Sequence, residues 1–327
     1  MNAQLMFIGK KLIRLILLLI VVSIAAFTLV EMSPVDSVQA YIGPNAMKLS
    51  SEKRAEIEEY WGLNEPITTR FVKWSRAIIK GDFGESLIYK RPVLDIIGEK
   101  FSASIILMMI AWTFSGVLGY ILALLSGSRQ GGILDKGIKA YCYLLLSTPT
   151  FWLCLLLIVV FSVSLGWFPV ALSTPIGVLS SEVTIWDLAH HMILPAITLG
   201  TNNTAIIARM TRSSMLEVIR QDYIRTARSK GVNSTTIIMK HALRNASIPV
   251  VTVIGLQIGA LLGGAVLTET VFSLPGLGTL MVNAIRSKDT PMVLGSIIVF
   301  TVLFSIVNLI VDILYAFLDP RIKAEYK

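Results

Sequence analysis

Six long apolar stretches constrain the fold of this chain more strongly than any other feature of its sequence. A helix needs about 20 residues to cross a hydrocarbon core of about 30 Å, and each stretch is long enough to do so. Inside a bilayer no water satisfies the backbone N–H and C=O groups, so such stretches must be helical. We therefore predict an all-α polytopic membrane protein with six transmembrane helices. They are predicted at residues 11–32, 101–125, 139–165, 194–215, 248–267 and 291–318.

The composition supports this fold class. Hydrophobic residues make up 54% of the chain, against about 45–50% in soluble proteins. A net charge of +8 would suit nucleic acid, but the basic residues lie in particular loops rather than in one stripe. That distribution indicates a lipid bilayer, and no nucleic acid, as the partner. Cys142 and Cys154 share one apolar stretch, where a helix would separate them by about 18 Å, so they are predicted to pack rather than to form a disulfide.

The positions of Lys and Arg predict the orientation, because these residues accumulate in short cytoplasmic loops. The N-terminus, the turn at 129–136, the loop at 209–244 and the C-terminal tail are basic, whereas 166–193 has no Lys or Arg. Both termini are therefore expected in the cytoplasm. The first stretch is similar to a secretory signal, but its apolar run exceeds the roughly 7–15 residues of such a signal, so we expect it to be retained as a span.

These predictions divide the chain into four segments. Residues 1–32 form a cytoplasmic tip and the first span, 33–100 an extracytoplasmic helical segment, 101–318 a five-helix core with a cytoplasmic loop at 216–247, and 319–327 a cytoplasmic tail. In the extracytoplasmic segment, a serine cap, early acidic residues and a glycine stop predict a helix at 51–62, and a second helix is predicted from Pro66 to Ile79. The segment is either a solvated tether or a cap that faces a partner.

The loop after the fourth predicted span is the most informative part of the sequence. Tyr223, Ala227 and Gly231 recur every fourth residue and share one helical face, while the basic residues of the loop project elsewhere. Ile224 lies beside that face. Gly231 is expected to end the helix, either in a left-handed conformation or at a close contact. From the residues alone, a helix that docks on a partner and an amphipathic helix that lies on lipid headgroups are both open.

The same loop carries the motif of a family. Inner-membrane permeases of binding-protein-dependent ATP-binding cassette (ABC) importers have a cytoplasmic pattern of Glu-Ala-Ala, three residues and Gly. Residues 225–227, Arg-Thr-Ala, followed by Gly231, resemble this pattern, although the first two positions differ from Glu-Ala. The stretch 222–231, DYIRTARSKG, is similar to the variant found in the dipeptide, oligopeptide and nickel branch. Further stretches resemble that branch in the same order and spacing: 61–66 (WGLNEP), 81–86 (GDFGES), 272–278 (FSLPGLG) and 319–321 (DPR).

The resemblance implies the fold of a type I importer permease and a subunit that forms half of a translocation pathway in a prokaryotic inner or plasma membrane. The partners it implies are a second homologous permease in a heterodimer, two cytoplasmic ATPase subunits and an extracytoplasmic solute-binding protein. The cargo it implies is di- or oligopeptides, with nickel or a metal chelate as the alternative. The residues it places in an ATPase-coupling helix are Asp222, Tyr223, Arg225, Thr226, Ala227, Lys230 and Gly231.

No catalytic site is predicted. The chain has no G-x-x-x-x-G-K-[ST] loop, so ATP and magnesium are expected on the ATPase subunits. This chain is expected to bind no cofactor and to be a transport subunit rather than an enzyme. Its three histidines are too few to assemble a nucleophile, a base and an orienting residue. His190, His191 and Met192 are adjacent and lack the spacing of a metal site, so no metal ligands are predicted.

Two further sets of residues stand out in the apolar stretches. Thr201, Asn202 and Asn203 lie within the predicted fourth span, where polar groups avoid lipid, so they are candidates for the pathway wall. Hydrogen bonding between helices is the alternative explanation. A flat face for helix packing is predicted in the fifth span from a four-residue repeat of Gly255, Gly259 and Gly263.

A self-sufficient channel or an ion-coupled carrier is the alternative class of function. Carriers commonly have two similar halves and charged residues at mid-membrane. This sequence has no such internal repeat and few charges in its apolar stretches. These features favour the permease subunit over the carrier.

Overall fold

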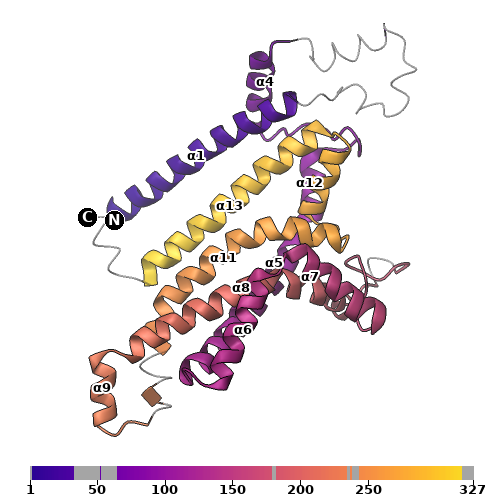
Figure 1. Cartoon of the computed structure of the whole chain (residues 1–327). Coiled ribbons are helices and arrows are strands. Elements are labelled where there is room, and N and C mark those ends of the chain that lie inside the picture. Colours follow the sequence, from indigo (N-terminus) through magenta and orange to yellow (C-terminus); the bar gives the residue numbers. More distant parts are fainter. Residues whose placement is uncertain are drawn as a thin grey trace. The chain divides into compact units, whose positions relative to one another are not determined.

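The computed structural model describes residues 2–32, 52, 65–178, 182–233, 236–237 and 243–318. Helices make up almost all of its regular structure (Figure 1), which confirms the predicted helical class. They are α1 (Asn2–Glu31), α4 (Ile67–Ile79), α5 (Val93–Ser128), α6 (Ile133–Ser147), α7 (Thr150–Leu157), the π-helix η2 (Ile158–Ser164), α8 (Ile185–Ile219), α9 (Asp222–Ser229), α11 (Leu243–Val271), α12 (Leu277–Arg286) and α13 (Thr290–Leu318).

Four helices in the described part of the chain are long and apolar enough to cross a membrane. They correspond to the first, second, fifth and sixth predicted spans. Their apolar portions are Lys11–Glu31, Val93–Ser128, Val253–Val271 and Thr290–Val311. A multi-pass membrane protein is therefore confirmed for these four stretches.

The third predicted span is not one continuous helix. The stretch 139–165 falls on α6 and on α7 with η2, and the two parts meet at an angle of 105°. Pro149 causes the break, because proline lacks a backbone N–H and disfavours the helical conformation in the residue before it. Thr148 is accordingly extended, with φ −90° and ψ 122°. If the bent pair counts as one span, the described residues hold five candidate spans.

The fourth predicted span, 194–215, lies inside α8, which is not among the helices apolar enough to pass as a span on composition. α8 can be less apolar than the other long helices because it is enclosed by neighbouring helices. α8 contacts α6, α7 and α11, and side chains around most of its middle are buried, including Leu199, Ala205 and Ile207. A helix enclosed by other helices does not need an apolar surface toward lipid.

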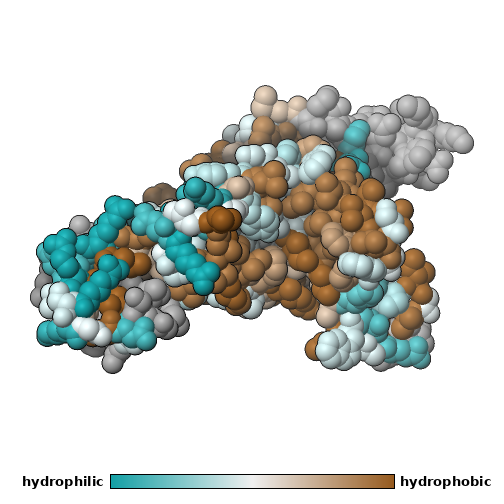
Figure 2. All heavy atoms as spheres, turned by 60° about the horizontal axis from the view of Figure 1, so that its bottom comes forward, coloured by the Kyte–Doolittle hydropathy of each residue, from teal (hydrophilic) through white to brown (hydrophobic). Residues whose placement is uncertain are grey.

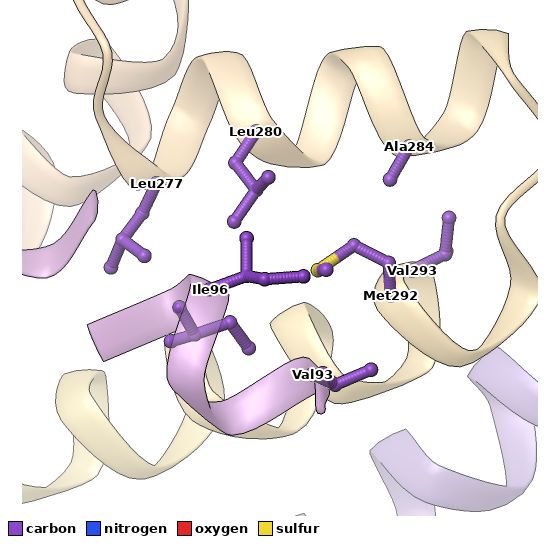
Figure 3. Close-up of a cluster of buried hydrophobic side chains, with 8 residues drawn as sticks. Val93, Ile96, Leu277, Leu280, Ala284, Met292 and Val293 are labelled. Carbon is purple, nitrogen blue, oxygen red and sulfur yellow. The ribbon is translucent and has the colours of Figure 1, made fainter. Parts of the chain in front are cut away.

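The helices belong to two compact units, and the boundary between them falls within α5 and α13. The first unit comprises Met1–Ser102 and Gly276–Ile306, and the second comprises Ala103–Pro275 and Val307–Lys327. In the first unit, side chains of α12 point toward those of α5 and α13 and form one buried apolar cluster (Figure 3). Its members include Val93, Ile96, Leu277, Leu280, Ala284, Met292 and Val293.

The helix predicted after Pro66 is confirmed as α4. Phe71 and Trp74 of α4 pack on Phe27 of α1, with ring centroids 5.4 and 5.5 Å apart. This aromatic cluster fixes α4 against the end of α1 within the first unit. The helix predicted at 51–62 lies outside the described residues.

The GDFGES stretch has a structural role in the first unit. Gly81 and Gly84 have positive φ values of 84° and 76°, and the turn brings Ser86 to Asp289. The carboxylate of Asp289 is buried and accepts bonds from the Ser86 hydroxyl and from the backbone N–H of Leu87, at 3.1 Å. It also accepts from the backbone N–H of the third residue of α13, at 3.3 Å. Asp289 therefore caps α13 and holds the GDFGES turn beside its first residues.

In the second unit, α5 and α8 approach each other closely at two glycines, one on each helix. A Cβ atom on Gly119 of α5 would lie 2.9 Å from the Thr204 carbonyl oxygen of α8. A Cβ atom on Gly200 of α8 would lie 2.9 Å from the Ala111 carbonyl oxygen of α5. α6 packs on α8 through an apolar cluster, so that α5, α6 and α8 form one packed group. The cluster consists of Ile138, Cys142, Leu145, Ala205 and Ala208.

Candidate functional site

The predicted coupling helix is formed as α9, which follows directly on α8 (Figure 1). Ile224 is fully buried, and Ala227 is half-buried on the same side. The polar residues face away: the side chain of Arg225 is 79% exposed, and its pairing with Asp222 at 3.5 Å is a surface contact of little energetic value. Hydrophilic side chains gather at this end of the second unit (Figure 2). α9 is thus held by one apolar anchor and presents a charged outer surface.

Gly231 ends this helix in a left-handed conformation, with φ 75°. Its backbone N–H bonds to the Arg228 carbonyl at 2.9 Å, and the N–H of Val232 bonds to the Ala227 carbonyl at 3.2 Å. These two bonds make a Schellman motif, which satisfies carbonyl groups that the end of a helix leaves free. Among the described residues, no heavy atom lies within 4 Å of where a Cβ atom of Gly231 would be. Of the two reasons predicted for this glycine, the left-handed conformation therefore applies and the close contact does not.

The helix that precedes α9 is fixed by a buried ion pair that the sequence did not reveal. Asp135, in the first turn of α6, is fully buried. Its Oδ1 accepts from Nε of Arg212, on α8, at 2.7 Å, and its Oδ2 accepts from Nη2 of the same residue at 2.9 Å. The hydroxyl of Ser126, on α5, donates to Oδ1, and the backbone N–H of Gly131 donates to Oδ2 at 2.9 Å. One carboxylate therefore joins α5, the turn, α6 and α8.

The pathway candidates lie on the buried middle of α8. The hydroxyl of Thr201 donates to the carbonyl of Ile197 in its own helix, a bond that satisfies the hydroxyl without a neighbouring helix. Asn203 is 5% exposed. Asn202 is half-buried, and its Oδ1 atom is buried without a hydrogen-bond partner in the described residues. Asn202 is therefore the member of this set whose side chain still has an unsatisfied acceptor.

The three predicted packing glycines of α11 have different surroundings. A Cβ atom on Gly255 would lie 2.7 Å from a methyl group of Val311 on α13. Gly259 is half-buried, and Gly263 is exposed, with no atom of the described residues within 4 Å of where its Cβ atom would be. The neighbouring Gly264 is the one that approaches α8, with Leu199 2.9 Å from its Cβ position.

Comparison with known proteins identifies the family. The model of the "Binding-protein-dependent transport system inner membrane component" family matches residues 115–324. A second model, for the N-terminal region of this membrane component, matches residues 4–108. The chain belongs to this family of permeases.

Relatives of this permease match it over nearly its whole length. It is 37% identical to the oligopeptide transport system permease protein AppB of Bacillus subtilis, over 97% of this chain and 99% of the relative. It is 39% identical to the di/tripeptide transport system permease protein DppB of Pseudomonas aeruginosa and 38% identical to the dipeptide transport system permease protein DppB of Escherichia coli. Both of these matches cover 98% of this chain and 99% of the relative.

Solved structures show the same fold at low sequence identity. The MetNI methionine ABC transporter in an inward-facing conformation matches with a TM-score of 0.55 and 18% identity, over 69% of this permease and 97% of that chain. An amino acid ABC transporter matches with a TM-score of 0.53 and 12% identity, over 68% and 94%. The fold of an ABC importer permease is thereby confirmed.

At the start of α8, this permease holds its two adjacent histidines against a loop. Thr184 and Asp187 form a capping box, and the bonds from Thr184 lower the pKa of the Asp187 carboxyl. The Nε2 atom of His190 lies 2.8 Å from the carbonyl oxygen of Trp167, and Nδ1 of His191 lies 3.0 Å from that of Leu172. Each ring therefore donates to a carbonyl. Among the described residues, no group of three His, Cys, Asp or Glu side chains is close enough to hold a metal ion.

Another buried acidic residue of this permease, Glu269, was also not predicted from the sequence. Glu269, on α11, is 1% exposed and accepts a bond from the Ser104 hydroxyl of α5 at 2.5 Å. It lies three residues before the FSLPGLG stretch, and its backbone carbonyl accepts from the N–H of Leu274 at 2.8 Å. Ser273 between them has a positive φ of 52°. The chain turn that follows α11 is therefore built around Glu269.

Proposed function

We propose that this permease forms half of the translocation pathway of an ATP-driven importer whose cargo is di- or oligopeptides. The observation that carries the proposal is similarity of 37–39% identity, over 97–98% of the chain, to three permeases named for oligopeptide, di/tripeptide and dipeptide transport. Nickel or a metal chelate is the less favoured cargo. A transport assay with the purified complex tests which cargo is correct. Labelled peptide should be taken up, and unlabelled peptide, but not nickel, should compete with it.

The proposed complex contains a second homologous permease, two cytoplasmic ATPase subunits and an extracytoplasmic solute-binding protein. ATP and magnesium act on the ATPase subunits, and this chain contributes no catalytic residue. The exposed Gly263 on α11 offers a flat surface on which a helix of the second permease would pack closely. This arrangement makes the chain one half of a pathway rather than a self-sufficient channel or carrier.

The proposed topology has six spans and both termini in the cytoplasm. The four apolar helices supply four spans, and α6 with α7 and η2 supplies a bent fifth. α8 supplies the sixth, because its polar residues are enclosed by neighbouring helices rather than by lipid. The basic turn at 129–136 and α9 then lie on the cytoplasmic side with the segments 1–10 and 319–327. The segment 33–100 lies outside the cell membrane.

α9 is proposed to dock on an ATPase subunit through the residues Asp222, Tyr223, Arg225, Thr226, Ala227, Lys230 and Gly231. The buried Ile224 holds α9 to the permease, and its charged surface is free to meet a partner. A movement of α9 would pass into α8, since the two helices are joined by a short turn at Arg220 and Gln221. The Asp135–Arg212 pair would then pass it to α5 and α6 as a nearly rigid-body movement.

Substitution of Gly231 tests the coupling role. Valine at φ 75° carries a strain of about 1–3 kcal/mol, which distorts the end of α9 without touching the apolar helices. Asparagine is the matched control, because it tolerates the left-handed conformation. In the reconstituted complex with its binding protein, Gly231→Val is expected to lose peptide uptake relative to cargo-stimulated ATP hydrolysis, and Gly231→Asn to retain both. Uptake and hydrolysis at wild-type rates in Gly231→Val would remove α9 from the coupling role.

Asn202 is the leading pathway candidate within the proposed set of Thr201, Asn202 and Asn203. Its Oδ1 atom lacks a partner in the described residues, and a buried acceptor without a partner costs about 1–3 kcal/mol. A passing peptide has backbone N–H groups that would satisfy this acceptor for the time of passage. The hydroxyl of Thr201 already has an acceptor in its own helix, so it contributes less to the proposed pathway wall.

A further inference from the structure

A small cavity lies between α6 and α8, beside the Asp135–Arg212 ion pair, and its lining is basic. Lys139, Arg209 and Arg212 line it together with Tyr143 and Cys142. The cavity has a volume of about 60 Å³. A single water-sized group needs about 10–15 Å³, so the cavity has room for about four to six such groups. That is enough for a phosphate group and far too little for a peptide in transit.

The charges around the cavity are not balanced. Arg212 is neutralised by Asp135, whose two oxygens already accept from Arg212, Ser126 and Gly131. Lys139 lies 3.6 Å from the same carboxylate, too far for a hydrogen bond. Arg209 is exposed and has no carboxylate within 4 Å in the described part of the chain. Three cations therefore face one saturated carboxylate, which leaves an excess positive charge of about two.

The surroundings of the cavity combine this charge with an exposed apolar surface. On α6, Tyr143 is 58% exposed and Leu144 is 65% exposed, one turn beyond Lys139. Tyrosine is enriched where a membrane protein passes through the headgroup region, with its ring toward the acyl chains and its hydroxyl toward water. A free anion in water would gain nothing from this apolar surface, whereas the acyl chains of a lipid would cover it.

We propose that this cavity binds the phosphate of an anionic phospholipid in the cytoplasmic leaflet. Lys139 and Arg209 contact the phosphate oxygens, the Tyr143 hydroxyl donates to the headgroup, and the acyl chains lie along α6. Basic cavities between helices at the cytoplasmic side suit such headgroups. The orientation rests on the topology proposed above. A bound lipid at this place would hold α6 to α8 beside the Asp135–Arg212 pair.

Retention of lipid by the purified permease with its partner subunits tests the site. The complex would be placed in phosphatidylcholine nanodiscs containing a minor fraction of phosphatidylglycerol, then transferred to detergent, washed and analysed by native mass spectrometry. Lys139→Gln and Arg209→Gln are each expected to reduce retained phosphatidylglycerol about five-fold, the effect of one basic residue near a membrane surface. The matched controls, Lys136→Gln on α6 and Arg220→Gln at the end of α8, are expected to retain it as the wild type does.

Two results would overturn the proposal. Equal retention in all four variants would show that lipid is held elsewhere. Displacement of the retained lipid by millimolar inorganic phosphate, with phosphate bound in its place, would show that the cavity serves a soluble anion. Peptide uptake measured on the same samples is a separate readout. If the Lys139 and Arg209 variants lose lipid but no sample transports peptide, wild type included, the result would count against the peptide function. It would not count against the lipid site.

Discussion

Removing the charge of Asp135 should destabilise the second unit of the permease by several kcal/mol. The carboxylate is fully buried and makes both of its oxygens available to Arg212, whose side chain is 19% exposed. In Asp135→Asn the amide N–H₂ group would face the guanidinium, which has only donors, so Arg212 would be left largely unpaired. Breaking a buried pair in this way costs about 3–5 kcal/mol. The partial exposure of Arg212 favours the lower end, about 3 kcal/mol.

Thermal unfolding followed with a thiol-reactive dye measures this cost, because Cys142 and Cys154 are both buried and react only when the helices separate. At about 2–4 °C per kcal/mol for a domain of this size, the midpoint of Asp135→Asn should fall by about 6–12 °C. Adding Arg212→Gln removes the stranded charge and should recover more than half of the loss. Asp222→Asn, which breaks an exposed pair, is the control and should leave the midpoint unchanged.

Two results are expected if the Asp135–Arg212 pair stabilises the second unit. The single variant must be clearly less stable than the wild type, and the double variant must be more stable than the single variant. A double variant that is as unstable as Asp135→Asn would show that the hydrogen bonds from α5 and the turn, rather than the pairing with Arg212, make the carboxylate important. A midpoint unchanged in the single variant would show that the pair contributes no net stability.

Three further predictions concern packing, the pathway and the topology. Gly119→Ala should lower the thermal midpoint, because its Cβ atom would lie 2.9 Å from the backbone of α8. Gly116→Ala on the same helix should not, because its Cβ atom would meet no atom of the described residues within 4 Å. Asn202→Leu should change the rate or selectivity of peptide uptake with little loss of assembled complex, and normal transport would show that the amide only packs. A cysteine at Ser173, in a background without the native cysteines, should react with an impermeant thiol reagent in intact cells, and one at Ser229 should not; labelling only at Ser229 would invert the topology.

Features that depend on neighbouring residues could be predicted from the sequence. The Schellman motif at Gly231 closes within six residues, from the Ala227 carbonyl to the N–H of Val232, so the glycine that ends α9 was recognisable from its position after an amphipathic helix. The break at Pro149 is equally local, because this proline divides the stretch 139–165, predicted as one span, into two helices that meet at 105°. The glycine repeat of α11 was visible as well, but its packing partners were not: Gly255 meets α13 and Gly263 meets open space.

By itself, the sequence determined that this protein is a helical membrane permease, because hydropathy, helix length and the spacing of the family motifs are written along the chain. Only the tertiary structure decided which polar side chains meet. Asp135 and Arg212 are 77 positions apart, and Ser86 and Asp289 are 203 positions apart. Neither pair has a periodicity that links its members. A buried carboxylate is stable only where folding brings donors to it from several elements, and that convergence depends on how the helices pack rather than on any one stretch of sequence.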